Sequence, residues 1–313
     1  MTTLVLGGAP VRDLGHLAIL RHAQRSLPDA GRMLMMTPDP KAPPEAVVAG
    51  FAGLATRVGQ VLLTGSFLRR HALEQSLAVA GAAVAAGARF VVHNLALEGD
   101  AAAEARPAGA EVLRHAALIE VRDHRTATQM TCWDIGRQPR ILAYPERHEA
   151  ADDALCATLP EGPILGVAIR NGDDMEAAWR PNLAAVTAAL GEAAGWPALP
   201  LHICPPGNGE DDLAGTRAFL DALRPGAALL LPELADPKTW QARITPARLK
   251  ALAGRCALVV TNRDLPAAYA TACGVPVLGL SIGGDRRLLT CMATLARELP
   301  QGSRMLVLQA TAG

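Results

Sequence analysis

The sequence is poor in aromatic side chains and in lysine. Phe, Trp and Tyr make up 3% of the 313 residues, so Ala, Leu and Val must fill the core. Lysine occurs only at Lys41, Lys238 and Lys250, and nearly all positive charge is arginine, whose guanidinium can hold a phosphate or carboxylate with two parallel donors. The formal net charge is zero and no basic stripe with interleaved aromatics occurs, so we expect no nucleic-acid partner.

Long apolar runs, a leader-like segment and paired cysteines are also missing. The first eight residues lack a basic region and resemble a strand. The most apolar stretch, Leu73–Ala88, contains Glu74 and is shorter than the roughly 20 apolar residues that span a membrane. The six cysteines form no CxxC pair, which is typical of reduced thiols. We therefore expect a cytoplasmic protein with no transmembrane segment, no disulfide framework and no metal site.

Several motifs of nucleotide enzymes and hydrolases do not occur. No GxGxxG follows the first predicted strand and no GxxxxGK[ST] is present, which argues against dinucleotide oxidoreductases and P-loop NTPases. A GxSxG elbow, an HExxH pair and an EF-hand loop are missing as well. We expect no bound cofactor, and the chemistry must come from other side chains.

Short apolar runs alternate with helical patterns along the chain, and a charged stretch from His148 to Gly162 interrupts the alternation. This pattern predicts an α/β fold with mostly parallel sheets and right-handed crossovers. Because it occurs twice, we expect two Rossmann-like doubly wound domains, residues 1–158 and 159–313, facing a central cleft. Ligands collect at the carboxyl ends of such strands. The predicted strands are Thr3–Leu6, Met33–Met36, Val61–Thr64, Phe90–His93, Leu118–Val121, Arg140–Ala143, Ile164–Ile169, Leu199–Cys204, Ala227–Leu231, Ala257–Thr261, Val275–Leu280 and Met305–Leu308.

The C-terminal half contains an ordered set of motifs. Residues 244–252 resemble a capped helix, 256–263 a strand that ends in arginine, 267–273 a helix of small residues and 274–281 a buried strand. This order resembles the polysaccharide pyruvyl transferase family, in which the segment runs TPEELKxL, ADLVV, xRLHA and AAGVPVVGLSYD. Further matches are LGHLAIL at 14–20, TGSFL at 64–68, ALIEVRD at 117–123 and ILGVAIR at 164–170. The resemblance implies a glycosyltransferase-B-like fold.

The sequence departs from that family at several polar positions. Leu265 stands where the family motif RLH has its histidine, and Gly15-His16-Leu17 replaces the opening GDE. The segment 93–97 replaces a QGIGP segment, and Tyr144-Pro145 replaces an Asp-Pro pair. The strands of the scaffold are kept while polar residues are lost, so the sequence supports the fold better than the activity.

The resemblance implies transfer of pyruvate from phosphoenolpyruvate to a sugar as a ketal, in the synthesis of a surface polysaccharide. The acceptor would be lipid-linked or an oligosaccharide, and the protein would associate peripherally with a polysaccharide-synthesis complex. Phosphate and carboxylate both require cationic donors. Arg170 and Arg263 each end a predicted strand, and Arg122 follows a third, so we expect these arginines to bind the anion. Asp285, which matches the aspartate of SYD, would contact a sugar hydroxyl or cap a helix.

Proton transfer requires an acid and a base with a pKa near neutrality. His93 ends a predicted strand and His16 opens the first helix, so either could serve. Asp264 could replace the missing histidine if burial raised its pKa, although the neighbouring Arg263 opposes this.

Two other functions remain open. One is a glycosyltransferase of the same fold that uses a nucleotide sugar, because a fold alone does not fix a function. The other is a non-catalytic partner in polysaccharide synthesis, which the losses at Leu17, Tyr144 and Leu265 would also fit. Stabilisation by a nucleotide sugar instead of phosphoenolpyruvate would favour the first.

Overall fold

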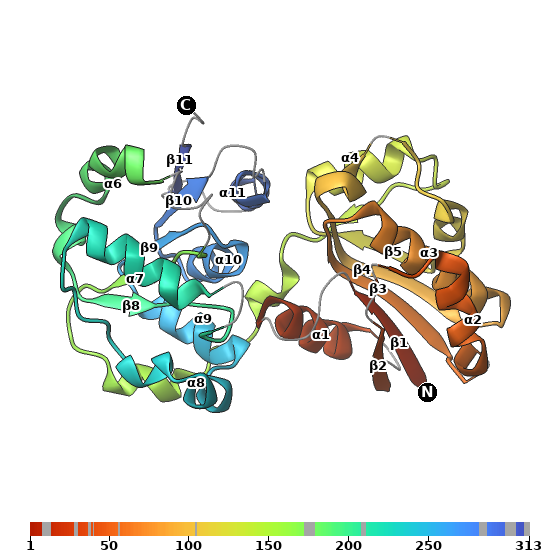
Figure 1. The fold of residues 1–313 in the computed structure, drawn as a ribbon, viewed down its shortest axis with the longest axis horizontal. Helices are drawn as coiled ribbons and strands as arrows, with labels where there is room; N and C mark the ends of the chain where they lie inside the picture. Colours follow the sequence, from red (N-terminus) through yellow and green to blue (C-terminus); the bar gives the residue numbers. More distant parts are fainter. Residues whose placement is uncertain are drawn as a thin grey trace. The chain divides into compact units, whose positions relative to one another are not determined.

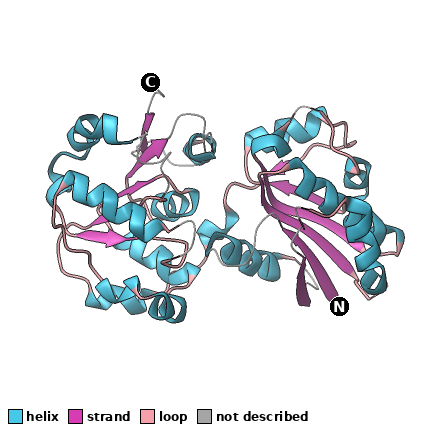
Figure 2. Ribbon diagram, viewed as in Figure 1, coloured by secondary structure: helices cyan, strands magenta, loops and turns pink. Residues whose placement is uncertain are grey.

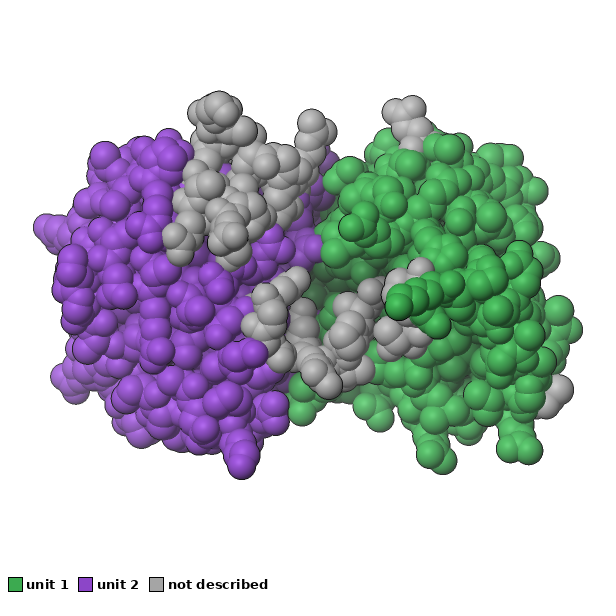
Figure 3. Space-filling model, viewed as in Figure 1, with its two compact units in different colours: residues 1–11, 16–146 green, residues 12–15, 147–313 purple. Residues whose placement is uncertain are grey.

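Strands and helices alternate along the chain, as the sequence predicts. The computed structural model describes residues 1–7, 14–27, 31–36, 39, 41–55, 57–103, 105–171, 179–207, 211–281, 287–297 and 305–309. The chain divides into unit 1, residues 1–11 and 16–146, and unit 2, residues 12–15 and 147–313 (Figure 3). Each unit has its own parallel sheet with helices around it (Figures 1 and 2).

The described strands of unit 1 form a parallel sheet in the order β2-β1-β3-β4-β5-β6. The strands are β1 (Thr2–Gly7), β2 (Arg32–Met36), β3 (Gln60–Phe67), β4 (Arg89–Leu97), β5 (Leu118–Val121) and β6 (Arg140–Ile141). The helices are α1 (Leu14–Ser26), α2 (Pro44–Ala55), α3 (Arg70–Ala85), η1 (Gly99–Ala102), η2 (Ala110–His115), α4 (His124–Cys132) and η3 (Pro145–His148).

Successive side chains of the unit 1 strands point to opposite faces of the sheet. Val5, Leu62 and Val91 pack in a cluster with residues of α1. Leu63 and Val92 belong to the larger core cluster, which includes residues of α2 and α3 (Figure 1). We call the first face the α1 face, because it carries the residues discussed below.

The described strands of unit 2 form a second parallel sheet, in the order β11-β10-β9-β7-β8. The strands are β7 (Leu165–Ala168), β8 (Ala198–Pro200), β9 (Leu258–Thr261), β10 (Val277–Ser281) and β11 (Met305–Gln309). The helices are η4 (Asp153–Thr158), η5 (Arg180–Asn182), α6 (Leu183–Leu190), η6 (Gly191–Gly195), α7 (Asp212–Leu223), η7 (Pro232–Ala235), α8 (Pro237–Arg243), α9 (Pro246–Arg255), α10 (Asp264–Ala272) and α11 (Arg287–Ala296).

Helix α7 lies unusually close to the carboxyl end of β7. A Cβ atom at Gly215 would lie 2.4 Å from the Ile169 carbonyl oxygen and 2.6 Å from the Asn171 nitrogen, so only glycine fits here. The next residue, Thr216, accepts a hydrogen bond from the Ile169 amide through its hydroxyl at 3.1 Å. The side chain of Asp211 caps the helix by accepting from two first-turn amides. The end of β7 and the start of α7 are therefore fixed to each other.

The predicted fold class is confirmed, because both units are doubly wound parallel sheets. One predicted strand is wrong: Ala227–Leu231 forms only an isolated bridge between Leu229 and Ala198. Gly226 precedes this segment with φ of 74° and Leu231 ends it with φ of 52°, so extended backbone is interrupted on both sides. No helix in the described part of the chain has the length and apolar character that crossing a membrane requires.

The domain boundary predicted after residue 158 stays a prediction. The segment before that residue is bonded to α9 of unit 2. Arg248 donates from Nε to Asp152 Oδ2 at 2.8 Å, and Lys250 donates to the Glu149 carbonyl. These bonds explain why the division into compact units falls at residues 146 and 147.

Candidate functional site

Doubly wound sheets bind ligands outside the carboxyl ends of their strands, at the point where the strand order reverses. In unit 2, the chain passes from β7 to β8 on one side and then returns to β9 on the other side of β7. In unit 1, it passes from β1 to β2 and returns to β3 on the other side of β1. The reversal points therefore lie between β7 and β9 in unit 2, and between β1 and β3 in unit 1.

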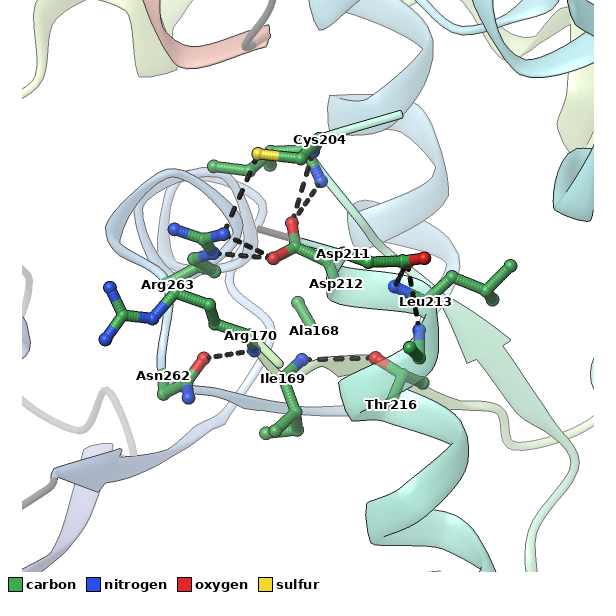
Figure 4. A network of polar contacts seen from close by, with 12 residues as sticks. Ala168, Ile169, Arg170, Cys204, Asp211, Asp212, Leu213, Thr216, Asn262 and Arg263 are labelled. Carbon is green, nitrogen blue, oxygen red and sulfur yellow. Dashed lines mark hydrogen bonds and ion pairs between the residues drawn. The ribbon is translucent and has the colours of Figure 1, made fainter. Parts of the chain in front are cut away.

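Arg170 and Asn262 stand at the reversal point of unit 2. Arg170 follows β7 and Asn262 follows β9, and both are partly exposed. The Arg170 amide donates to Asn262 Oδ1 at 2.8 Å, which joins the two strand ends (Figure 4). Because Oδ1 accepts this bond, Nδ2 of Asn262 is the donor end of its side chain. The predicted arginine therefore lies where a ligand is expected, beside an amide that sequence reasoning did not single out.

Arg263 lies close by but is enclosed in the protein. It is 4% exposed, and its Nε and Nη2 both donate to Asp212 Oδ1, the Nε bond being 2.8 Å long (Figure 4). The other oxygen of Asp212 accepts from the amides of Ile203 and Cys204 at 2.9 and 3.2 Å. Burial raises the pKa of Asp212, and the Arg263 guanidinium opposes that rise. Anion binding by Arg263 stays a prediction, whereas the observed contacts give it a structural role.

The remaining residues of unit 2 that the sequence analysis singled out are Asp264, Leu265 and Asp285. Asp264 begins α10 and its Oδ1 accepts from the Leu265 amide at 2.9 Å. Leu265, at the position of the family histidine, is 2% exposed and belongs to the core. Asp285 lies outside the residues that the structure describes. Roles for Asp264 and Asp285 therefore stay predictions.

His93 of unit 1 forms a buried pair with Glu120. Nδ1 of His93 lies 2.7 Å from Oε2 of Glu120, and the two side chains are 1% and 8% exposed. The other oxygen of Glu120 accepts from Arg140 at 3.2 Å. The hydrogen bond from His93 lowers the pKa of Glu120, and burial opposes the effect. The ring of His22, from α1, stacks on His93 with centroids 5.3 Å apart.

Arg122 belongs to a second buried network in unit 1. Its Nε donates to Asn94 Oδ1 and its Nη1 to Ser66 Oγ, both at 3.1 Å. Asn94 in turn donates to Glu146 at 2.8 Å, and the Arg122 guanidinium lies 5.2 Å from the centre of the Tyr144 ring. Asn94 and Tyr144 have φ of 53° and 47°, which is uncommon for residues other than glycine. Arg122 is 4% exposed, so its role in anion binding stays a prediction.

His16 lies beside the reversal point of unit 1. A Cβ at Gly65 would lie 3.1 Å from His16 Nε2, and the φ of Gly65 is 84°. Glycine therefore allows the imidazole to approach the end of β3. The structure places His16 and His93 in unit 1 and Arg170 at the reversal point of unit 2, and the cleft expected between the halves stays a prediction.

Sequence reasoning missed Glu120, Asp212 and Asn262. Glu120 lies inside the quoted motif at 117–123, but its partner His93 is 27 residues earlier. The contact depends on strand register, which one sequence does not reveal. Only the fold brings Asp212 to Arg263, 51 residues away.

No family model matches the sequence, and no curated protein matches it. The resemblance to pyruvyl transferases therefore stays a prediction. Several solved structures have a similar fold. A putative UDP-N-acetylglucosamine 2-epimerase from Listeria monocytogenes matches with TM-score 0.53 and 12% identity, over 97% of this chain and 84% of that chain. The UDP-GlcNAc 2-epimerase of Methanocaldococcus jannaschii matches with TM-score 0.51 and 9% identity, over 99% and 89%.

The UDP-GlcNAc 2-epimerase of Neisseria meningitidis, in a structure bound to UDP-GlcNAc, matches with TM-score 0.50 and 9% identity, over 97% of this chain and 88% of that chain. At these identities the likeness concerns the fold alone. The chain therefore has two Rossmann-like units of the glycosyltransferase-B type.

Proposed function

We propose that this chain is a nucleotide-sugar enzyme of the glycosyltransferase type. We propose further that the diphosphate of its donor binds at the carboxyl edge of the unit 2 sheet. The observation that carries the proposal is the junction of Arg170 and Asn262 at the reversal point between β7 and β9. A guanidinium and a side-chain amide therefore both come from residues at the point where doubly wound sheets bind ligands.

The chemistry of a diphosphate fits these two side chains. Its oxygens are acceptors, and a guanidinium can hold them with two parallel donors. The Arg170 backbone amide orients Asn262 by donating to its Oδ1, so that Nδ2 is the donor end of that side chain. Arg263 cannot contribute to diphosphate binding as strongly as Arg170, since Asp212 already neutralises the charge of Arg263.

The solved structures of similar fold support a nucleotide sugar over phosphoenolpyruvate. One of them is bound to UDP-GlcNAc. The phosphoenolpyruvate donor implied by the sequence resemblance remains the second candidate. Its family histidine is replaced here by Leu265, whose side chain is in the core. Both donors are anions, so binding experiments must compare them directly.

Isothermal titration calorimetry with UDP, UDP-GlcNAc and phosphoenolpyruvate tests the proposal. We expect UDP and UDP-GlcNAc to bind the wild type, and Arg170→Ala to weaken that binding about 10–100-fold, the loss expected for a charged hydrogen-bonding group. Asn262→Ala should weaken it less, because it removes a neutral donor.

Arg243→Ala is the matched control, because it removes the same charge from unit 2. Arg243 forms an exposed ion pair with Glu233 at 2.7 Å, so we expect unchanged nucleotide affinity. Binding of phosphoenolpyruvate alone would replace the proposal with pyruvyl transfer. No binding of any of the three would contradict both and favour the non-catalytic partner.

A further inference from the structure

On the α1 face of the unit 1 sheet, polar side chains of β3 and β4 stand level with the glycine that ends β1. Gly7 of β1, Thr64 of β3 and His93 of β4 are paired in register as one row across the three strands. The row before it, towards the amino ends, is Val5, Leu62 and Val91, which pack against α1. The sheet therefore changes from apolar to polar within two residues of the end of β1. This change coincides with the reversal point between β1 and β3.

Two polar atoms in this row are buried without a hydrogen bond. Thr64 and His93 are 2% and 1% exposed. Neither Oγ1 of Thr64 nor Nε2 of His93 has a partner within the part of the chain that the structure describes. Buried polar atoms are nearly always bonded, and these two lie on paired strands, so one hydroxyl group between them would satisfy both.

The third member of the row, Gly7, has no side chain. Among the described atoms, a Cβ at Gly7 would contact the Thr64 carbonyl oxygen at 3.8 Å and a Met35 methyl carbon at 3.9 Å, which are ordinary contacts. The position therefore accepts a methyl group without a clash against the described residues.

Glu120 determines which nitrogen of His93 can accept a proton from a ligand. The Glu120 carboxylate only accepts hydrogen bonds, so Nδ1, 2.7 Å away, carries the proton. In the neutral ring, Nε2 is then the acceptor. The charged and titratable groups around this pair are Glu120 on β5, Arg140 on β6 and His22 on α1. A carboxylate that bonds Nδ1 and stabilises the protonated ring is the general arrangement of a histidine base.

We propose that Thr64, His93 and Glu120 form a site for a sugar hydroxyl, with His93 as the catalytic base and Glu120 as its positioning residue. The hydroxyl donates to Nε2 of His93 and accepts from Oγ1 of Thr64. The catalytic step rests on the proposed function. The hydroxyl O–H bond breaks and an N–H bond forms at Nε2. The oxygen attacks the anomeric carbon of the nucleotide sugar, and the anomeric C–O bond breaks, leaving its electron pair on the diphosphate.

The binding site is tested by long-range ¹H–¹⁵N spectra of protein labelled at histidine. In the wild type we expect His93 to be protonated at Nδ1 and not at Nε2. Titration with methyl glucoside, methyl galactoside and N-acetylglucosamine should shift the Nε2 resonance saturably with at least one sugar. A resonance that no sugar moves would overturn the site. This result does not depend on nucleotide, so the site and the function of unit 2 can fail separately.

Gly7→Ala tests the position of the sugar, because it adds a methyl group in register with Thr64 without replacing a polar group. We expect the fold, followed by its thermal transition, to be kept and the saturable Nε2 shift to be lost. Gly59 is unsuitable as a control, since a Cβ there would lie 2.4 Å from Met1. Gly81→Ala is the matched control in unit 1, because its Cβ would meet only a Val112 methyl at 3.9 Å. An unchanged sugar titration in Gly7→Ala would contradict the assigned position.

The catalytic role is tested by the release of UDP from UDP-GlcNAc in the presence of the sugar that shifts Nε2. His93→Gln should lower turnover about 100-fold or more, a typical contribution of a general base, while UDP affinity stays at the wild-type value. Glu120→Gln should lower kcat and leave the KM for UDP-GlcNAc unchanged, because the amide no longer holds Nδ1 as the carboxylate does. A wild type that binds UDP but releases none, or a His93→Gln variant with full turnover, would overturn the catalytic role.

Discussion

The two sheets bury their polar clusters in different ways. In unit 2, Asp212 accepts from Arg263 through one oxygen and from two backbone amides through the other. In unit 1, Glu120 bonds His93 and Arg140, while Nε2 of His93 has no partner among the described residues. Both carboxylates use both oxygens in contacts within the protein. The unit 1 cluster differs because Nε2 of His93 has no bond to another described residue.

The difference follows from the chemistry of the two cations. Arginine keeps its charge in a protein, so the buried Arg263 guanidinium is stabilised by the Asp212 carboxylate beside it. Histidine can lose its proton and remain buried as a neutral ring. A buried Arg–Asp pair is therefore a fixed structural element, whereas a His–Glu pair can take up and release a proton. We use this difference to separate structural residues from candidate catalytic ones.

The largest effect is expected from breaking the pair in unit 2. Asp212→Asn leaves the Arg263 charge buried without a carboxylate, and should cost about 3–5 kcal/mol of unfolding free energy. Glu120→Gln is the matched change in unit 1, and should cost only about 1–2 kcal/mol because a neutral His93 ring leaves no buried charge behind. Urea denaturation of both variants measures the two costs. Equal costs would contradict the distinction between a fixed and a titratable pair.

A histidine of unit 2 provides the next test. His202 is 1% exposed and stacks on Trp240 of α8, with ring centroids 5.6 Å apart. Burial lowers its pKa from 6.5 to about 4, and the nearby Asp211 opposes the shift. The unfolded chain therefore binds a proton between these pH values that the folded chain does not bind. His202 contributes stability above pH 6.5, and that contribution is lost as the pH falls towards 4.

The loss should reach about 3 kcal/mol at the acid end, at 1.36 kcal/mol per pKa unit. Urea denaturation from pH 7 to pH 4 measures it, with His202→Phe as the reference because that ring stacks but does not titrate. The difference between wild type and variant isolates His202 from other groups. A parallel pH dependence in both proteins would show that His202 does not titrate as its burial requires.

The fold could be predicted because it depends on local patterns. Apolar runs of strand length alternate with amphipathic helices, and this alternation predicts parallel sheets. The segment Ala227–Leu231 failed because its composition is that of a strand, while the backbone at Gly226 and Leu231 prevents extension. Apolar composition alone does not distinguish a strand from a buried connection.

The candidate site could be predicted only in part, because its contacts are distant in the sequence. A strand that ends in arginine gave the position of Arg170, but not that Arg263, at the end of the adjacent strand β9, would be neutralised by Asp212. The sequence also selected His93, since it ends an apolar run. Its pairing with Glu120 and its place beside Gly7 and Thr64 depend on register between strands. Sequence patterns therefore find residues near the strand ends. Only the three-dimensional structure shows which of these side chains are already bonded to other parts of the protein.

The smallest effect is expected at the solvent side of the unit 1 pair. Arg140 bonds Glu120 at 3.2 Å, but its side chain is 69% exposed, and such pairs contribute about 0.2–1 kcal/mol. The hydrogen bond from His93 is the largest cause of the lowered pKa of Glu120, ahead of the charge of Arg140. Arg140→Ala should therefore leave the carboxylate ionised and His93 protonated at Nδ1. Urea denaturation and the histidine ¹⁵N spectrum measure both. A change of protonated nitrogen would mean that the pair depends on its exposed arginine, as Asp212 and Arg263 depend on each other, and the contrast between the two units would disappear.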